Sequence, residues 1–255
     1  MHEVRAKKSL GQHFLTDEAA LAAIVAAAEL EPEDHVLEIG PGTGAMTTLL
    51  AREVKQLTAV EVDDRMIPLL TAMLSPYPGA RVIHGDFLRE KLNIPAPYKV
   101  VANLPYYITT PIMERLLTLW PAPASITVLV QKEAALRMTA APGGKDYGPL
   151  SLRTALWGRA SIPLEIGPES FDPPPKVDSA LVHIVPSPTD GAEAAMAVAN
   201  VAFLQRRKQL GNALGGLGKP KDAIHAALEA CGIEPSRRPE TLTPEEFVAL
   251  GKALK

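Results

Sequence analysis

A glycine-rich turn constrains the fold of this chain more than any other segment. Gly40-Pro41-Gly42-Thr43-Gly44 follows a short apolar run at residues 36–39 and precedes a helical pattern at residues 43–54. Because glycine lets the backbone turn sharply and leaves room for a ligand against the main chain, this order indicates a strand, a ligand-binding turn and a helix. Such a unit is typical of α/β folds with a parallel sheet.

Further apolar segments predict that this sheet continues along the chain. Four segments have the length and composition of buried strands, namely residues 57–62, 82–86, 99–103 and 126–130. Helical patterns occupy most of the gaps, and an Ala- and Leu-rich helix is expected over residues 17–30, with Thr16 or Asp17 as its cap. Strands that alternate with helices predict a parallel sheet covered on both faces.

The pattern changes in the last third of the chain. Several prolines between residues 163 and 175 exclude a long helix, and residues 177–185 predict one more strand. A linker is indicated by the Pro, Ser and Gly content of residues 186–191, and the rest is helical except for a glycine-rich interruption at residues 211–218. We therefore expect an α/β domain over residues 1–186 and a small helical domain over residues 187–255.

The composition limits the class of protein. The chain has 255 residues, of which 47% are hydrophobic, which is enough for one full core and a small second domain. No apolar run reaches the ~18 residues of a membrane span, and the single cysteine, Cys231, excludes an intramolecular disulfide. We expect a cytoplasmic monomer that needs neither a membrane nor a metal.

The glycine turn and a later carboxylate together predict a nucleoside-containing ligand. Glu61 lies 21 residues after Gly40, at the end of the next predicted strand, where a carboxylate can accept hydrogen bonds from both ribose hydroxyls. The turn reads G-x-G-x-G, and Glu38 precedes it, which suits a cationic ligand better than a pyrophosphate. S-adenosylmethionine (AdoMet) carries an ammonium and a sulfonium, so it fits; the alternative is a glycine turn without a ligand.

Asp86 ends the third predicted strand, on the same sheet edge. Its carboxylate could accept a hydrogen bond from an adenine amine while Phe87 or Leu88 packs on the ring. The alternative is that Asp86 caps the segment that follows it.

The tetrapeptide Asn103-Leu104-Pro105-Tyr106 follows the fourth predicted strand and indicates a site for methylating a base amine. An adenine amine is a poor nucleophile because its lone pair is delocalised into the ring. The side-chain oxygen of Asn103 and a backbone carbonyl, that of Leu104, can accept its two N–H bonds and free the lone pair, while Pro105 stiffens the turn and Tyr106 stacks on the base. The alternative is a simple turn after a strand.

These motifs resemble the ribosomal RNA adenine N6-dimethyltransferases of the KsgA/RsmA type. The resemblance covers most of the chain. It rests on KSLGQHFL (residues 8–15), VLEIGPGTGAMT (36–47), NLPYYITTP (103–111), VQKE (130–133), YGPLS (147–151), FDPPPKVDSA (171–180) and FLQRRK (203–208).

The resemblance implies a Rossmann-like class I AdoMet-dependent methyltransferase domain followed by a small C-terminal helical domain. It implies two methylations of each of two adjacent adenosines, in a hairpin near the 3′ end of small-subunit (16S) rRNA. Carried over by position, the residues that contact AdoMet are His13, Leu15, Gly40, Gly42, Glu61, Asp86, Phe87 and Asn103. By the same resemblance Phe171 stacks on the target base opposite Tyr106; its residue type alone favours the core, and only its proline-rich context supports exposure.

Basic residues in the last part of the chain predict an RNA contact. Arg206, Arg207 and Lys208 follow the apolar pair Phe203-Leu204, where we expect them to begin a helix and to bind phosphates, rather than to form an ordinary solvated face. The other functions considered are an Erm-type methyltransferase of large-subunit rRNA, a DNA adenine methyltransferase and an RNA-binding assembly factor without turnover. The intact Asn103 and Glu61 argue against the last of these.

Overall fold

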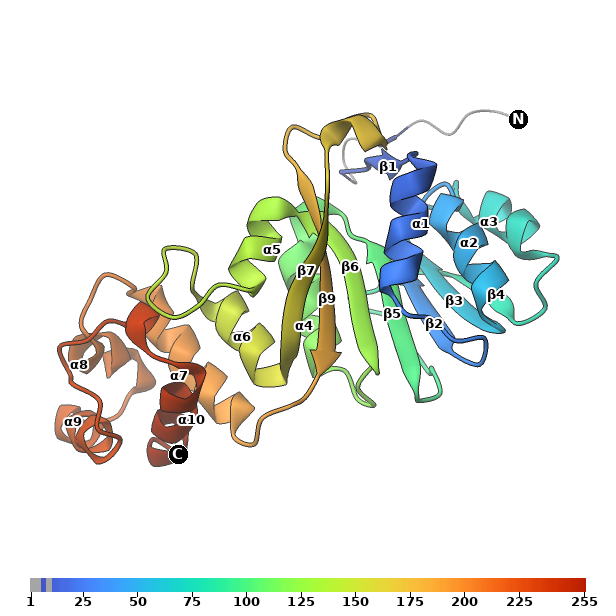
Figure 1. Ribbon diagram of the computed structural model, residues 1–255. Coiled ribbons are helices and arrows are strands. Elements are labelled where there is room, and N and C mark those ends of the chain that lie inside the picture. The colour runs from blue at the N-terminus through green and yellow to red at the C-terminus, as the bar shows by residue number, and fades with distance from the viewer. Residues whose placement is uncertain (1–5, 8–10) are drawn as a thin grey trace. The chain divides into compact units, whose positions relative to one another are not determined.

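A seven-stranded sheet in the order β4-β3-β2-β5-β6-β9-β7 forms the centre of the computed structural model, which describes residues 6–7 and 11–255 (Figure 1). Its strands are β2 (His35–Ile39), β3 (Gln56–Glu61), β4 (Ala80–His84), β5 (Tyr98–Asn103), β6 (Ser125–Gln131), β7 (Gly158–Ile166) and β9 (Ser179–Pro186). β2 to β6 are mutually parallel, and β9 is antiparallel to β6. This confirms the predicted α/β class.

Helices cover both faces of the sheet, which explains why its central strands are buried along nearly their whole length. All five residues of β2 are buried. The first three helices, α1 (Glu18–Ala27), α2 (Ala45–Glu53) and α3 (Ile67–Leu74), pack on one another along one face, and α4 (Thr109–Thr118) lies behind the sheet in Figure 1. Ile24 of α1 and Leu50 of α2 join Val36 and Leu57 in a common core, so the strand-and-helix alternation read from the sequence follows from burial on both sides.

Strand β7 was not predicted, because its sequence looks unlike a buried strand. Between its two buried ends, β7 alternates between exposed and half-buried residues, and Pro163 has no backbone N–H to donate. β7 is an edge strand of the sheet. An edge strand tolerates both a proline and a solvated face, which explains its unusual sequence.

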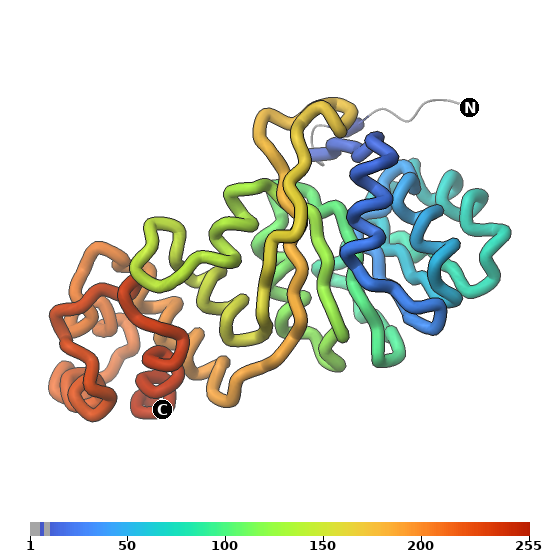
Figure 2. Tube along the Cα trace, in the orientation of Figure 1, coloured from blue at the N-terminus to red at the C-terminus, as the bar shows by residue number. Residues whose placement is uncertain are grey.

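Two short segments far apart in the sequence pair beside the sheet. β1 (Phe14–Leu15) is antiparallel to β8 (Phe171–Asp172), with Leu15 opposite Phe171 (Figure 2). Next to this pair, Asp17 caps α1 by accepting from the backbone N–H groups of Ala19 and Ala20. Of the two expected cap residues, Asp17 is therefore the one that caps α1. The Thr16 hydroxyl instead donates to the carbonyl of Ser170 at 3.2 Å.

The chain divides into two compact units, Met1–Ala135 with Ala160–Pro186, and Leu136–Arg159 with Ser187–Lys255. The division after Pro186 coincides with the expected boundary, but residues 136–159 join the second unit because α6 packs on α7. The helices of the second unit are α6 (Pro149–Trp157), α7 (Ala192–Leu204), α8 (Leu210–Ala213), α9 (Lys221–Ala230) and α10 (Pro244–Ala253), whereas α5 (Lys132–Met138) spans the division. Short 3₁₀ turns are η2 (Tyr106–Ile108), η3 (Pro168–Ser170), η4 (Leu214–Leu217) and η5 (Pro239–Thr241).

Candidate active site

Three segments line one cleft at the carboxyl ends of the parallel strands. They are the N-terminal strap (residues 11–15), the glycine loop (residues 40–44, of which 40–43 line the cleft) and the acceptor loop (residues 103–108), with Leu21, Glu38, Ala45, Met46, Glu61 and Val62 between them. The cleft holds about 860 Å³ of space, its open mouth included. Residues 8–10 of the N-terminal motif lie outside the described residues.

The glycine loop follows β2 and leads into α2, as predicted. Gly40, Gly42 and Gly44 have φ angles of 67°, 55° and 84°, a left-handed region that side chains rarely adopt. A Cβ on Gly42 would also lie 3.1 Å from the ring of Phe14. The G-x-G-x-G pattern is therefore required by the backbone of this loop and by its close approach to the strap.

Glu61 fixes the glycine loop from the end of β3. One carboxylate oxygen accepts from the backbone N–H of Gly42 at 3.0 Å, and the other accepts from that of Asp63 at 2.8 Å. The side chain is buried but lines the cleft. Because each carboxylate oxygen can accept more than one hydrogen bond, the two backbone contacts leave capacity for ligand hydroxyls.

Glu38 is a buried carboxylate beside the glycine loop. It is 0% exposed and lines the cleft, and neither of its oxygens has a hydrogen-bond partner among the residues that the structure describes. Burial raises the pKa of Glu38 to about 8; the neighbouring Thr47 hydroxyl opposes this shift, and the charge of Glu61 adds to it. A buried group of this kind is satisfied by a donor, which a cationic ligand in the cleft can supply.

The acceptor loop begins at the end of β5, with Asn103. The Asn103 amide nitrogen donates a hydrogen bond to the carbonyl oxygen of His13, 3.4 Å away. The side-chain oxygen of Asn103 therefore remains available as an acceptor. Leu104 donates its N–H to the carbonyl of Leu129, and the Pro105 carbonyl accepts from Ile108 N–H and from the Thr109 hydroxyl. These bonds hold the loop between β6 and α4.

Tyr106 is held at two points. Its hydroxyl lies 2.5 Å from the hydroxyl of Ser179, and the His13 ring stacks on it with 5.6 Å between ring centroids. Burial raises the pKa of Tyr106, opposed by the Ser179 hydrogen bond. Neither contact was predicted from the sequence, because the partners are distant along the chain and no local pattern pairs them.

Three predicted site residues do not line the cleft, namely Asp86, Phe87 and Phe171. Asp86 accepts from the backbone N–H of Leu88 at 2.9 Å and pairs with Arg89, which is the capping role considered as its alternative. Phe87 is 4% exposed, with the Arg115 guanidinium 4.9 Å from its ring centroid. Both follow β4, at the edge of the sheet.

Phe171 is also buried, which corrects the expectation that it is exposed. Its side chain is 4% exposed and lies in the core with Leu15 and Leu21. The pairing of β8 with β1 is the reason, since it places Phe171 opposite Leu15. The proline-rich context excluded a helix but did not show which way this side chain faces.

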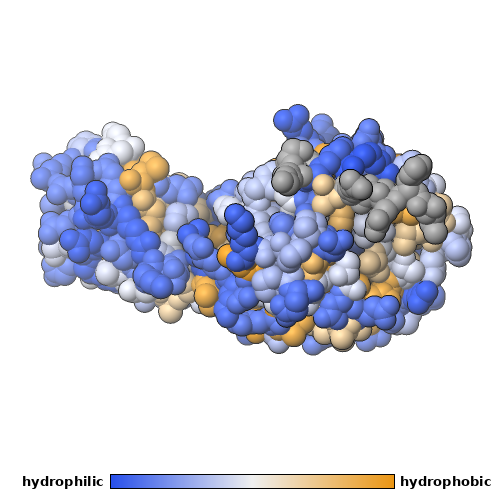
Figure 3. All heavy atoms as spheres, turned by 90° about the horizontal axis from the view of Figure 1, so that it is seen from above, coloured by the Kyte–Doolittle hydropathy of each residue, from blue (hydrophilic) through white to orange (hydrophobic). Residues whose placement is uncertain are grey.

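In the second unit, the three adjacent basic residues differ in their environments. They follow the end of α7 in a series of turns, and so do not begin a helix as expected. Arg206 donates to the carbonyls of Gly144 and Lys145, at 3.3 and 2.9 Å, whereas Arg207 and Lys208 are exposed. Figure 3 shows a mostly hydrophilic surface on this unit.

The described residues contain no cluster of three or more His, Cys, Asp or Glu side chains that could hold a metal ion. None of the helices in this part of the chain is long and apolar enough to cross a membrane.

Comparison with known proteins identifies the family. The family described as "Ribosomal RNA adenine dimethylase" matches residues 3–255. The "Ribosomal RNA small subunit methyltransferase A" of Dehalococcoides mccartyi (strain CBDB1) is 43% identical, over 98% of this chain and 88% of the relative. Among solved structures, a dimethyladenosine transferase from Plasmodium falciparum superposes with a TM-score of 0.82 at 27% identity, covering 93% of this chain and 96% of that one.

The 23S rRNA methyltransferase ErmE superposes with a TM-score of 0.71 at 29% identity, covering 94% of this chain and 99% of that one. The match to the family is therefore nearly complete in length, and it agrees with a methyltransferase fold that carries the acceptor loop at its cleft. The chain belongs to the ribosomal RNA adenine dimethylase family.

Proposed function

We propose that this enzyme transfers methyl groups from AdoMet to N6 of two adjacent adenosines in a hairpin near the 3′ end of small-subunit (16S) rRNA, giving N6,N6-dimethyladenosine. One observation carries the proposal: in a chain of this family, the loop Asn103-Leu104-Pro105-Tyr106 shares a single cleft with the glycine loop. A methyl donor and a base amine could therefore meet without movement of the sheet.

The cleft fits AdoMet by the chemistry of its acidic residues. The unpartnered carboxylate of Glu38 suits the ammonium of the ligand, and Glu61 suits the ribose hydroxyls. His13, Leu15, Gly40, Gly42 and Asn103 complete the proposed cofactor-contacting set in this cleft. When bound, AdoMet supplies an electrophilic methyl group on its sulfonium.

The acceptor loop supplies positioning and hydrogen-bond acceptors. The Asn103 side-chain oxygen and the Leu104 carbonyl accept the two N–H bonds of the adenine amine, which favours a tetrahedral nitrogen and frees its lone pair. Tyr106 stacks on the base with the ring face opposite His13, and its bond to Ser179 fixes the ring. A base within RNA must first be unstacked to reach this pocket.

Small-subunit rRNA is favoured over large-subunit rRNA by the names of the relatives. The Dehalococcoides mccartyi relative and a protein from Geobacter sulfurreducens, 41% identical over 98% of this chain, are both named "Ribosomal RNA small subunit methyltransferase A". The likeness to ErmE keeps the large subunit as the alternative to be tested. The proposal further places the protein in the cytoplasm as a monomer, in keeping with its free Cys231.

The deciding experiment supplies labelled AdoMet with undermethylated small subunits or with large subunits, followed by digestion of the RNA to nucleosides. We expect label in N6,N6-dimethyladenosine from the small subunit alone. Label in large-subunit RNA would favour the Erm-type activity, and no label in either would favour an assembly factor without turnover.

A further inference from the structure

The N-terminal strap forms one wall of the cleft but has little secondary structure to hold it. Gly11, Gln12, His13, Phe14 and Leu15 all line the cleft, and only the last two belong to a strand. That strand pairs with a partner of equal length, and so short a ladder is weak alone. Other contacts must therefore position residues 11–13.

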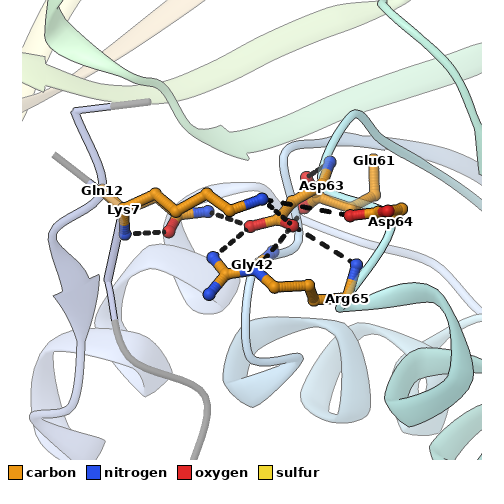
Figure 4. A network of polar contacts seen from close by, with 7 residues as sticks. All are labelled: Lys7, Gln12, Gly42, Glu61, Asp63, Asp64 and Arg65. Carbon is orange, nitrogen blue, oxygen red and sulfur yellow. Dashed lines mark hydrogen bonds and ion pairs between the residues drawn. The ribbon is translucent and has the colours of Figure 1, made fainter. Parts of the chain in front are cut away.

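Asp63, two residues after Glu61, supplies such contacts to the N-terminal segment (Figure 4). One of its oxygens accepts from Lys7 Nζ at 3.1 Å and from Arg65 Nε at 3.0 Å. The other accepts from Gln12 Nε2 at 3.1 Å and from Arg65 Nη2 at 2.6 Å. The Gln12 side-chain oxygen in turn accepts from the backbone N–H of Lys7 at 2.7 Å, which closes the network.

The carboxylate of Asp63 depends on these donors. Its side chain is 0% exposed, so the charge is stable there only while it is hydrogen-bonded. The Arg65 guanidinium lowers the pKa of Asp63 most; burial opposes the shift, and Gln12 and Lys7 add to the lowering. Lys7 and Gln12 come from the N-terminal segment, so the Asp63 carboxylate connects that segment to the residues after β3.

The same residue is joined to the glycine loop through Glu61. The Asp63 backbone N–H donates to one Glu61 oxygen, and the other Glu61 oxygen accepts from Gly42. At its other end the strap meets the acceptor loop, through the His13 ring on Tyr106 and the His13 carbonyl beside Asn103. The strap thus connects the walls of the proposed cofactor and acceptor subsites.

We propose that Asp63 is a positioning residue that latches the N-terminal strap across the cofactor side of the cleft. This inference rests on the proposed AdoMet site. For ligand binding, the latch holds Gln12 and His13 in place for AdoMet. For catalysis, the strap aligns Tyr106 with the methyl donor.

The test compares Asp63→Asn with Asp64→Asn, a matched control at the exposed neighbouring carboxylate, which lies 3.9 Å from Lys7. Binding of S-adenosylhomocysteine is measured by calorimetry below the unfolding transition of each variant. Because Asp63→Asn removes the charge that Lys7, Gln12 and Arg65 bind, we expect about tenfold weaker binding or more for this variant. Asp64→Asn should bind like the wild type.

Two further readouts separate the latch from general stabilisation. Hydrogen exchange of the backbone amides of residues 11–16 should increase in Asp63→Asn while the amides of β2 and β5 remain protected. Lys7→Met should weaken binding less than Asp63→Asn, and the double variant should lose less than the sum of both, because the two residues act through one contact.

Unchanged affinity and exchange in Asp63→Asn would overturn the latch, as would equal losses in Asp64→Asn. Additive losses in the double variant would show that Asp63 and Lys7 act independently of each other, which would also overturn the latch. If the wild type itself does not bind S-adenosylhomocysteine, the proposed cofactor site fails instead, so the two failures are distinguishable.

Discussion

The carboxylate of Glu61 accepts a hydrogen bond from the backbone N–H of Gly42 at 3.0 Å, so the acid expected to bind ribose also holds the glycine loop. Its second oxygen accepts from Asp63 N–H. Binding and positioning therefore share one side chain, and a substitution there should affect both.

Glu61→Gln is expected to weaken binding of S-adenosylhomocysteine about tenfold or more, since a charged acceptor is replaced by a neutral one that must also orient its amide. Isothermal titration calorimetry checks this. The control is Glu53→Gln, at the exposed end of α2, which should bind normally. Equal affinity for both variants would show that Glu61 only shapes the loop.

Asn103→Ala should lower kcat by about 100-fold or more, by analogy with the loss of one preorganised polar group at a reacting centre. Binding of RNA should be largely retained, because the lost acceptor acts on the reacting amine. Methyl transfer at saturating AdoMet and a gel-shift assay measure the two quantities. Near-normal kcat would mean that Asn103 is not the acceptor of the amine protons.

Glu38 predicts a pH dependence of stability. Because burial raises its pKa to about 8 in the folded chain, from an ordinary value of 4.5, the folded state binds the proton more tightly than the unfolded state. The stabilisation is complete below pH 4.5 and is lost as the pH rises through 8. The Tm of the ligand-free protein should therefore fall between about pH 5 and pH 8 and level off above that.

Glu38→Gln should flatten this fall, whereas Glu53→Gln should keep it. Thermal unfolding followed by circular dichroism at several pH values measures the slope. A wild-type slope that persists in Glu38→Gln would assign the effect to another group.

In the basic segment after α7, we expect Arg207 and Lys208 to bind RNA and Arg206 to stabilise the fold. Arg207→Ala with Lys208→Ala should weaken RNA binding and lower the slope of log K against log salt by about 1.5, since each phosphate contact contributes roughly 0.7 to 0.9. Arg206→Ala should instead lower the Tm, because Arg206 donates to the carbonyls of Gly144 and Lys145. The reverse pattern would assign RNA contact to Arg206.

Local sequence patterns were enough for the elements that carry the cofactor loops. The apolar runs that became β2 and β3, and the glycine turn between β2 and α2, are dictated by neighbours in the chain. The burial of Phe171 was not predictable, because it depends on pairing with a segment more than 150 residues away. Arg206 is a similar case, since its acceptors are carbonyls of a distant loop.

The acceptor loop was predictable from the sequence only in part. The order of strand and motif predicted that Asn103 and Tyr106 reach the cleft edge, and both line it. The partners of Tyr106 were not predictable, because Ser179 and His13 are brought to it by β9 and by the strap. Sequence patterns thus identify the reacting groups better than the residues that position them.

Gly11 gives the last prediction, because two separate constraints act on it. Its φ is +55°, and an added Cβ would lie 2.9 Å from Cδ1 of Tyr107, whose side chain is 57% exposed. Gly11→Ala should displace the strap and raise the KM for AdoMet several-fold, whereas Gly143→Ala, with φ +84° but open space around it, carries only the backbone strain. Adding Tyr107→Ala should restore part of the loss by removing the clash. Steady-state kinetics of the four proteins test this, and a double variant no better than Gly11→Ala would attribute the whole effect to the backbone of the strap.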